Sequence, residues 1–377
     1  MRTRLILALT AFGAPAAAAE PSPTPKVEPI AYVETYYAYN LNRPTNGITN
    51  YRGFDNRHNT FTLSNAVLGA EAQRGDVSGR LILQVGSTPS TYYLSEPTRA
   101  GTPGANATSP ELWKYLQEAN ISWKAPVGRG IVVQGGLVPS PIGFESFAVK
   151  DNWNYSHGNV FFGLPFYHAG ARATYEWSDS FATRVGVFNG WNSIVDNNDA
   201  KSVHAAAIYT IKDRLVLRGI YFGGAERSPG APEGPAWRHH FDANAELTAT
   251  RWLSLAAQAD YGFEPNRIGT ARWYVGTFYA RTKPSRFVYL AWRGDYFHED
   301  LATDDAPFGR TSTPLFWGGA SYVSSSTTTL DLRPVSNISF RLEHRIDVSD
   351  PAVPLFFRGD QPARTQSTVL IGATAWL

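Results

Sequence analysis

The sequence predicts an all-β protein, a transmembrane antiparallel β-barrel of about sixteen strands. Three observations predict it. Alternating polar and apolar residues recur in segments from residue 30 to the end, aromatic residues make up 14% of the chain, and the mean hydropathy is only −0.26. Strands with one face in lipid and the other in water have this composition, because the two faces cancel in the average. After the first residues, no stretch approaches the roughly 20 apolar residues that a membrane-spanning helix needs.

The chain begins with the features of an export signal. Arg2 and Arg4 precede a short apolar run, Leu5 to Phe12, and small residues follow at 16–19. This order is typical of a cleaved secretory signal. We therefore expect three parts, in chain order: a signal peptide at 1–19, a Pro-rich lead-in at 20–29 and one outer-membrane barrel domain at 30–377. This organisation predicts the outer membrane of a Gram-negative-type cell.

Charge and cysteine content exclude several classes of function. Removing residues 1–19 takes away two arginines and no acid, which leaves 32 basic and 32 acidic side chains. A nucleic-acid partner would need a basic excess, so we expect none. The chain has no cysteine, which excludes disulfides and cysteine-ligated metals. We expect no cofactor and no metal, and the expected partners are outer-membrane lipid and small hydrophilic solutes.

Strands are predicted where polar and apolar residues alternate with period two. Residues 238–248 are a clear example, because Arg238, Asp242 and Glu246 share one face while Phe241 and Leu247 share the other. The same reasoning gives these spans: 30–41, 59–74, 77–88, 111–125, 130–138, 166–178, 180–189, 200–212, 213–225, 238–250, 251–264, 268–282, 284–298, 315–332, 335–349 and 365–377.

The connections between these segments alternate in length. Short ones such as 75–76 and 126–129 are followed by long ones such as 42–58, 89–110 and 139–165. Outer-membrane barrels have short periplasmic turns and long extracellular loops. Aromatic residues near the segment ends suit an interfacial girdle: Tyr36, Tyr37, Tyr39, Trp113, Trp123, Trp177, Tyr209, Tyr221, Tyr261, Trp292, Tyr322 and Trp376.

The middle third of the chain resembles a known family, the OmpL-like β-barrel porins. The resemblance rests on Ile142-Gly143-Phe144-Glu145, on Asn152-Trp153-Asn154-Tyr155-Ser156, on Asn189-Gly190-Trp191-Asn192, and on Asp196 to Ser202. It implies an outer-membrane barrel with pore function, and it brings neither a substrate nor a catalytic residue. The chain departs from the usual pattern at its end, where Trp376-Leu377 replaces a terminal Phe or Trp.

We expect the long connection 139–165 to fold into the barrel as a constriction loop, as the loop at this position does in sixteen-stranded porins. Its turn-forming prolines and Gly143 would place apolar side chains on the wall and Glu145, Lys150 and Asp151 toward water. The candidate constriction residues are Phe144, Glu145, Lys150, Asp151 and Trp153. The alternative is an exposed surface loop. Trp153, Tyr155, Phe161 and Phe162 could also contact sugars if the loop lies inside.

Charged residues on the polar face of their segments are candidates to line the pore: Arg172, Arg238, Arg272, Arg293, Arg341 and Arg345, with Glu118, Asp242 and Glu246. Rings of fixed charge select ions by sign. The alternative is that these charges pair across neighbouring strands and stabilise the wall. Both roles can hold together.

The sequence carries no hydrolase motif such as G-x-S-x-G or H-E-x-x-H, so we expect no catalytic residue and no enzyme activity. The expected function is passive diffusion of small hydrophilic solutes or ions. Two alternatives stay open: a barrel hydrolase of lipase or protease type, and a plugged structural or adhesive barrel. By analogy with sixteen-stranded porins, a homotrimer is expected.

Overall fold

The computed structural model describes residues 24–98, 108–304 and 309–377. The expected signal peptide at 1–19 lies outside the described residues. Sixteen antiparallel strands close into a barrel, as predicted. Their bounds are β1 Lys26–Asn40, β2 Thr60–Arg74, β3 Val77–Val85, β4 Leu116–Ala125, β5 Ile131–Pro139, β6 Tyr167–Glu176, β7 Phe181–Phe188, β8 Ser202–Ile211, β9 Leu215–Ala225, β10 Trp237–Thr250, β11 Leu253–Pro265, β12 Thr270–Thr282, β13 Val288–Asp300, β14 Tyr322–Val335, β15 Ile338–Ser349 and β18 Thr365–Trp376.

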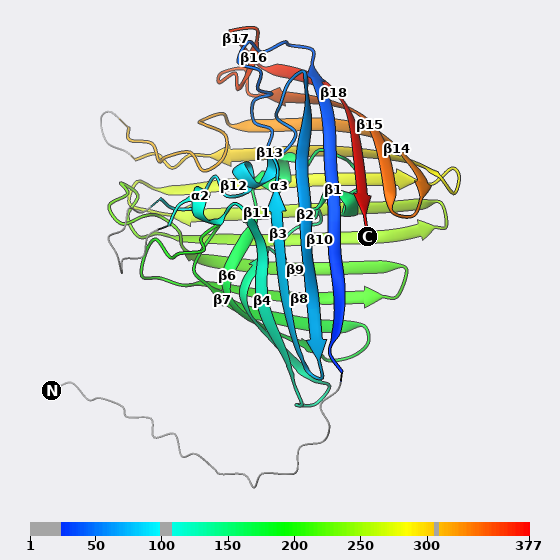
Figure 1. Ribbon diagram of the computed structural model, residues 1–377. Coiled ribbons are helices and arrows are strands. Elements are labelled where there is room, and N and C mark those ends of the chain that lie inside the picture. Colours follow the sequence, from blue (N-terminus) through cyan, green and yellow to red (C-terminus); the bar gives the residue numbers. More distant parts are fainter. Residues whose placement is uncertain (1–23, 99–107, 305–308) are drawn as a thin grey trace, which may run out of the picture.

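The barrel closes where the first strand meets the last. Figure 1 shows β1 (blue) beside β18 (red), and their register runs from Tyr32 opposite Trp376 to Asn40 opposite Thr368. Closure gives every strand two neighbours, which satisfies backbone hydrogen bonds that lipid could not. Strand β1 begins at Lys26, inside the expected lead-in, because residues 26–29 pair with the end of β2.

The short connections lie at one end of the barrel and the long ones at the other. The long loops carry small elements that the sequence did not predict: α1 Thr88–Tyr92, α2 Pro110–Trp113, the 3₁₀ helix η1 Val149–Asp151, α3 Asn159–Phe162, and a hairpin of β16 Phe356–Arg358 with β17 Gln361–Ala363. Among the described residues, no helix is long and apolar enough to cross a membrane.

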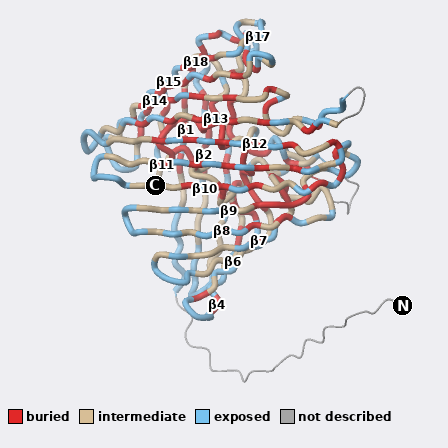
Figure 2. Tube along the Cα trace, turned by 180° about the vertical axis from the view of Figure 1, so that it is seen from behind, coloured by how far each residue is buried: buried red, intermediate tan, exposed pale blue. Residues whose placement is uncertain are grey.

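Alternation along the strands separates the lumen from the lipid-facing surface. In β15, Arg341, Glu343 and Arg345 point inward and are buried, while Leu342 and Ile346 point outward and are exposed. In the view of Figure 2, the tight turns are exposed and the buried positions concentrate along the strands. An apolar outer face with polar residues inside is the arrangement that a membrane barrel requires.

The outer surface carries aromatic residues near the strand ends, such as Trp123, Trp177 and Trp237, each more than 40% exposed. Three predicted members of the girdle are wrong. Trp113 lies in α2, where it packs against a buried cluster and its Nε1 donates to Thr108 Oγ1 at 2.9 Å. Tyr36 points inward, is buried and packs against Tyr155 with ring centroids 5.9 Å apart. Trp376 shares the inward parity of β18, because the last strand keeps its register with β1 to its end.

Candidate functional site

A long loop enters the barrel and occupies its middle, as predicted. This inward loop, residues 140–166, connects β5 to β6 and contains η1 and α3. Its backbone is tied to inward-facing side chains of distant strands. For example, Val149 N donates to Glu34 Oε1 of β1 at 2.7 Å, and Phe144 N donates to Gln258 Oε1 of β11 at 2.9 Å. The loop is therefore fixed at several points around the wall.

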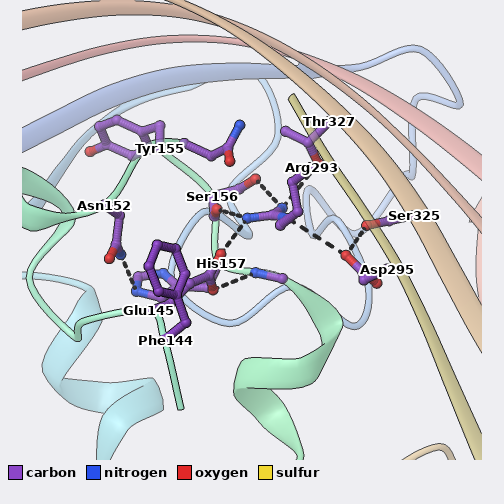
Figure 3. Close-up of polar contacts among 12 residues, drawn as sticks. Phe144, Glu145, Asn152, Tyr155, Ser156, His157, Arg293, Asp295, Ser325 and Thr327 are labelled. Carbon is purple, nitrogen blue, oxygen red and sulfur yellow. Dashed lines mark hydrogen bonds and ion pairs between the residues drawn. The ribbon is translucent and has the colours of Figure 1, made fainter. Parts of the chain in front are cut away.

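Glu145 of the inward loop forms a buried ion pair with Arg293 of β13 (Figure 3). Arg293 Nη1 lies 2.8 Å from Glu145 Oε1 and also donates to the carbonyl oxygen of Ser156 at 2.6 Å. The other carboxylate oxygen of Glu145 accepts from Gly158 N at 2.8 Å. Glu145 was expected to face water, and this is wrong, because its carboxylate joins two turns of the loop to the wall.

Strand β15 supplies a second set of anchors. Arg341 donates to the carbonyl oxygens of Val149 and Asn152, each at 2.8 Å, and Arg345 Nη1 donates to His157 O at 2.5 Å. Between these two arginines on the same strand, Glu343 accepts from the backbone N–H groups of Tyr155 at 2.7 Å and Ser156 at 3.0 Å. Along β15, the donors of Arg341 and Arg345 therefore lie opposite loop carbonyl groups, and the acceptor Glu343 between them lies opposite loop N–H groups.

These arginines are not open to solvent. Arg293 and Arg345 are 0% exposed and Arg341 is 1% exposed. A buried guanidinium is stabilised when several acceptors surround it, and here loop carbonyls and carboxylates fill that role. They hold the inward loop in place and do not present free charge to solvent.

The remaining predicted loop residues divide into two groups. Phe144 packs on Tyr279 (centroids 4.7 Å apart) and on Trp153, which is buried and lies under the guanidinium of Arg281 at 4.5 Å. Lys150 and Asp151 pair with each other at 2.8 Å and line a cavity of about 200 Å³ between the loop and β1–β5. Of the four aromatics considered as sugar contacts, Trp153, Tyr155 and Phe161 are buried in packing clusters, and only Phe162 is partly open.

His157 contributes to the interior of the loop as a neutral group. Burial lowers the pKa of His157 below its ordinary value of 6.5, because the charged imidazolium would lose its hydration. Its Nε2 lies 2.9 Å from Ser146 O, and its ring packs on Phe161 with centroids 4.3 Å apart. The neutral ring therefore joins two parts of the loop.

The predicted pore-lining charges occupy different environments. Arg238 pairs with Glu264 at 2.9 Å, Glu118 pairs with Arg80 at 3.0 Å, and Asp242 accepts from Asn244 at 2.6 Å while lying opposite Asp260 in the register. Glu246 is half-buried on the inner face of β10. Arg238 and Glu118 fit the alternative in which interior charges pair along the wall, whereas Asp242 and Glu246 form no salt bridge among the described residues.

Arg272 does not line the lumen, so that prediction is wrong. It is exposed on the outer face of β12, between the buried residues Ala271 and Trp273. Arg272 lies at the loop end of the strand, opposite Asp300 of β13 in the register. At this end of the strand, beyond the hydrocarbon layer, water can solvate an outward guanidinium. Arg272 can therefore face outward while the next residue, Trp273, faces inward.

The wall of β6 to β9 holds three arginines of another kind. Arg172 donates from Nε to Gln134 at 2.6 Å, Arg184 from Nε to Thr174 at 3.1 Å, and Arg218 from Nη1 to Asn244 at 3.0 Å. Among the described residues, no carboxylate oxygen lies within 4.0 Å of any of the three guanidinium groups. We call them the arginine trio.

Two members of the arginine trio, Arg184 and Arg218, were not singled out from the sequence. Both occupy the inward parity of their strands, which the alternation of 180–189 and 213–225 could have revealed. Arg184 lies within electrostatic range of Arg172 and of Arg218, and Arg172 also lies within range of the carboxylate of Glu118. Their neighbours on the inner face, including Gln134 and Thr174, stay half-exposed.

Comparisons with solved structures place the fold among outer-membrane channels. The barrel aligns with an anion-selective porin from Comamonas acidovorans at 11% identity, covering 94% of this chain and 100% of that one, with a TM-score of 0.62. The outer-membrane channel DcaP of Acinetobacter baumannii gives 11% identity, 94% and 97% coverage and a TM-score of 0.60. OmpT of Vibrio cholerae in its trimer form is 10% identical, with 94% of this chain and 100% of that chain covered and a TM-score of 0.58. At such identities, the likeness concerns the fold.

Sequence comparison identifies the family. No curated protein matches the chain. The family model described as "Putative beta-barrel porin-2, OmpL-like" matches residues 26–377, which is the whole barrel from the start of β1 to the last residue. With its closed sixteen-stranded barrel and inward loop, the chain belongs to this family of outer-membrane porins.

Proposed function

We propose that the protein is a passive diffusion channel for small hydrophilic solutes, with a preference for anions, and that it has no enzymatic activity. The observation that supports the preference is the arginine trio. Arg293 and Arg345, by contrast, have acidic partners, Glu145 and Asp347, and Arg281 of β12 lies over the ring of Trp153. A charge that is partly desolvated and whose hydrogen-bond partners are neutral favours a mobile counter-ion, so the wall of β6 to β9 attracts anions.

The passage would run beside the inward loop along β4 to β9. On the turn side of these strands the inward residues keep access to solvent, as with Lys124, Val132 and Gln134. On β13 to β15, by contrast, the inward residues are buried beneath the inward loop. An asymmetric filling of this kind leaves one polar wall available to water, and fixed charges on that wall select ions by sign.

The test is single-channel recording in planar bilayers under a KCl gradient, on the mature chain that we propose begins after residue 19. We expect discrete open steps and a reversal potential of the sign that marks anion preference. The variant with Arg172→Gln, Arg184→Gln and Arg218→Gln should keep the steps and move the reversal potential toward zero. A barrel that gives no steps argues against the channel, and an unchanged reversal potential in the variant argues against the arginine trio.

We also propose that the long loops face the cell exterior and that three copies assemble. The pattern of turns and loops supports the orientation. The trimer is supported by likeness in fold to OmpT of Vibrio cholerae, an outer-membrane protein whose solved structure is described as a trimer form. Cross-linking in native membranes should give a species of three chains, and a purely monomeric pattern would contradict it.

A further inference from the structure

At the loop end of the barrel lies a cavity of about 490 Å³, which we call the entry cavity. Four half-buried aromatic rings from four different loops line it: Tyr51, Phe162, Trp191 and Phe316. The arginine trio does not line this cavity, so the proposed anion preference does not explain it. Its volume is in the range of sites for small molecules.

The four rings are held by packing, so the cavity is formed before any solute arrives. Tyr51 lies 5.9 Å from Trp317 between centroids, and Phe316 contacts Trp273 at 5.4 Å. Phe162 lies so close to Gly53 that a Cβ on the glycine would fall 2.1 Å from its ring. Preformed rings lose little conformational entropy on binding, which favours affinity.

The charges around the entry cavity are neutralised within the protein. Arg52 pairs with Asp55 at 2.6 Å and with Asp347 at 2.9 Å. Arg227 pairs with Glu264 at 2.8 Å and lies 3.7 Å from Glu233, and Glu264 also binds Arg238 at 2.9 Å. The guanidinium groups that line the cavity therefore have carboxylate partners, so an anionic solute gains little there and neutral polar groups can still hydrogen-bond to them.

The indole ring of Trp191 contacts both a charged and an aromatic side chain. Arg238 lies over the indole at 5.4 Å from its centroid, and Phe222 meets it edge-on at 5.8 Å. A solute bound here meets an aromatic face next to a planar polar group. The aromatic face carries a partial negative charge, which attracts C–H groups that are polarised by neighbouring oxygen atoms.

We propose that the entry cavity binds neutral solutes with a hydroxylated six-membered ring, that is, sugars in their pyranose form. The C–H face of the sugar ring would lie on Phe162 and Phe316, and its hydroxyl groups would reach the paired guanidinium groups of Arg227 and Arg238. A wholly apolar solute would offer no acceptor to the remaining N–H groups of these guanidinium groups, and an acyclic polyol has no flat face for the rings. The proposal adds a binding step to the proposed channel and stands without ion selectivity.

The experiment measures binding to the folded, detergent-solubilised barrel by saturation-transfer NMR, with glucose and maltose as probes. Mannitol is the control solute, because it has hydroxyl groups without a ring. Phe162→Leu and Phe316→Leu should each weaken sugar binding by roughly fivefold, about the contribution of one aromatic contact. Phe287→Leu is the matched control, because Phe287 is 43% exposed next to a tight turn at the opposite end of the barrel, and its binding should equal that of the unmodified protein.

Folding of each variant is checked by its heat-modifiable mobility, so that a misfolded barrel is recognised. Binding of mannitol as strong as that of glucose would overturn the proposal, and so would sugar binding that both cavity variants leave unchanged. Binding of benzoate without binding of glucose would assign the cavity to aromatic acids and overturn the proposal as well. Because binding is measured without conduction, a barrel that gives no channel steps can still bind sugar, and the two failures are distinguishable.

Discussion

Arg293 and Glu145 form an ion pair 2.8 Å long that joins the wall to the inward loop, although 148 positions separate them in the sequence. Both side chains are almost fully buried, at 0% and 4% exposure. Around them, backbone N–H and carbonyl groups of the loop complete the hydrogen bonding. The position of the inward loop therefore depends on a few charged contacts.

Glu145→Gln leaves the buried guanidinium of Arg293 with a weaker set of acceptors. Removing one partner of a buried pair costs about 3 kcal/mol, because the remaining charge stays desolvated. We expect that loss in the free energy of unfolding, measured by urea titration in lipid vesicles. The control is Asp151→Asn, an exposed acid of the same loop, which should change it by less than about 0.5 kcal/mol. Equal effects from the two variants would contradict the anchoring role.

Arg341→Met removes the donor that satisfies loop carbonyls of Val149 and Asn152. Methionine fills a similar volume, so the loss concerns hydrogen bonding, and two buried carbonyls without a donor cost on the order of 2 kcal/mol. We expect the loop to detach in part, which should raise the open-channel noise in single-channel recordings. Arg333→Met is the comparison, since Arg333 pairs with Asp331 near the turns, and no bond joins it to the inward loop in the described structure. Quiet recordings from Arg341→Met would contradict this assignment.

His157 makes the inward loop sensitive to acid. Burial lowers the pKa of His157, so the folded state keeps the ring neutral at a pH where the unfolded chain already binds a proton. Its contribution to stability is complete above its ordinary pKa of 6.5 and declines as the pH falls from there toward the folded pKa. We expect lower unfolding free energy at pH 5 than at pH 7.5, and a smaller difference in His157→Gln. An identical difference in the two proteins would show that other groups cause the effect.

Arg184→Gln and Arg272→Gln compare the effects of an inward and an outward arginine on ion selectivity. In the described structure Arg184 points inward, donates to Thr174 and forms no salt bridge, while Arg272 is exposed on the outer face. We expect Arg184→Gln to move the reversal potential under a salt gradient toward zero and Arg272→Gln to leave it unchanged, because lumen charges alone act on the permeating ion. An effect of Arg272→Gln equal to that of Arg184→Gln would contradict the placement of the selective charges.

Most of the fold could be predicted from local pattern, because a strand's period of two is visible in any short window. Strand β15, predicted at 335–349, occupies Ile338–Ser349, and its alternation separates Arg341 from Leu342 without any knowledge of the neighbours. Arg272 shows the limit of this approach. Near the end of a strand a charged and an aromatic residue compete for the inner face, and the register with β11 and β13 decides between them.

The site was less accessible to sequence reasoning, because its contacts join distant segments. The inward loop was expected from its length and place in the chain, but the partner of Glu145 depends on how β13 is aligned in the barrel. The same holds for Arg345, which was assigned to the lumen and binds the carbonyl of His157. A charge on the inner face can meet solvent or loop backbone, and the tertiary structure alone distinguishes the two.

Gly372→Ala tests the fit between the inward loop and the wall. A Cβ at Gly372 of β18 would lie 2.3 Å from the ring of Tyr155, which is buried and packed against Tyr36 and cannot turn aside. The loop must move, so we expect a changed single-channel conductance and a loss of roughly 2 kcal/mol in stability. Gly276→Ala is the matched control, because a Cβ there has nothing within 4 Å. If both variants conduct like the unmodified protein, the loop is not packed against β18 as tightly as the ring of Tyr155 indicates.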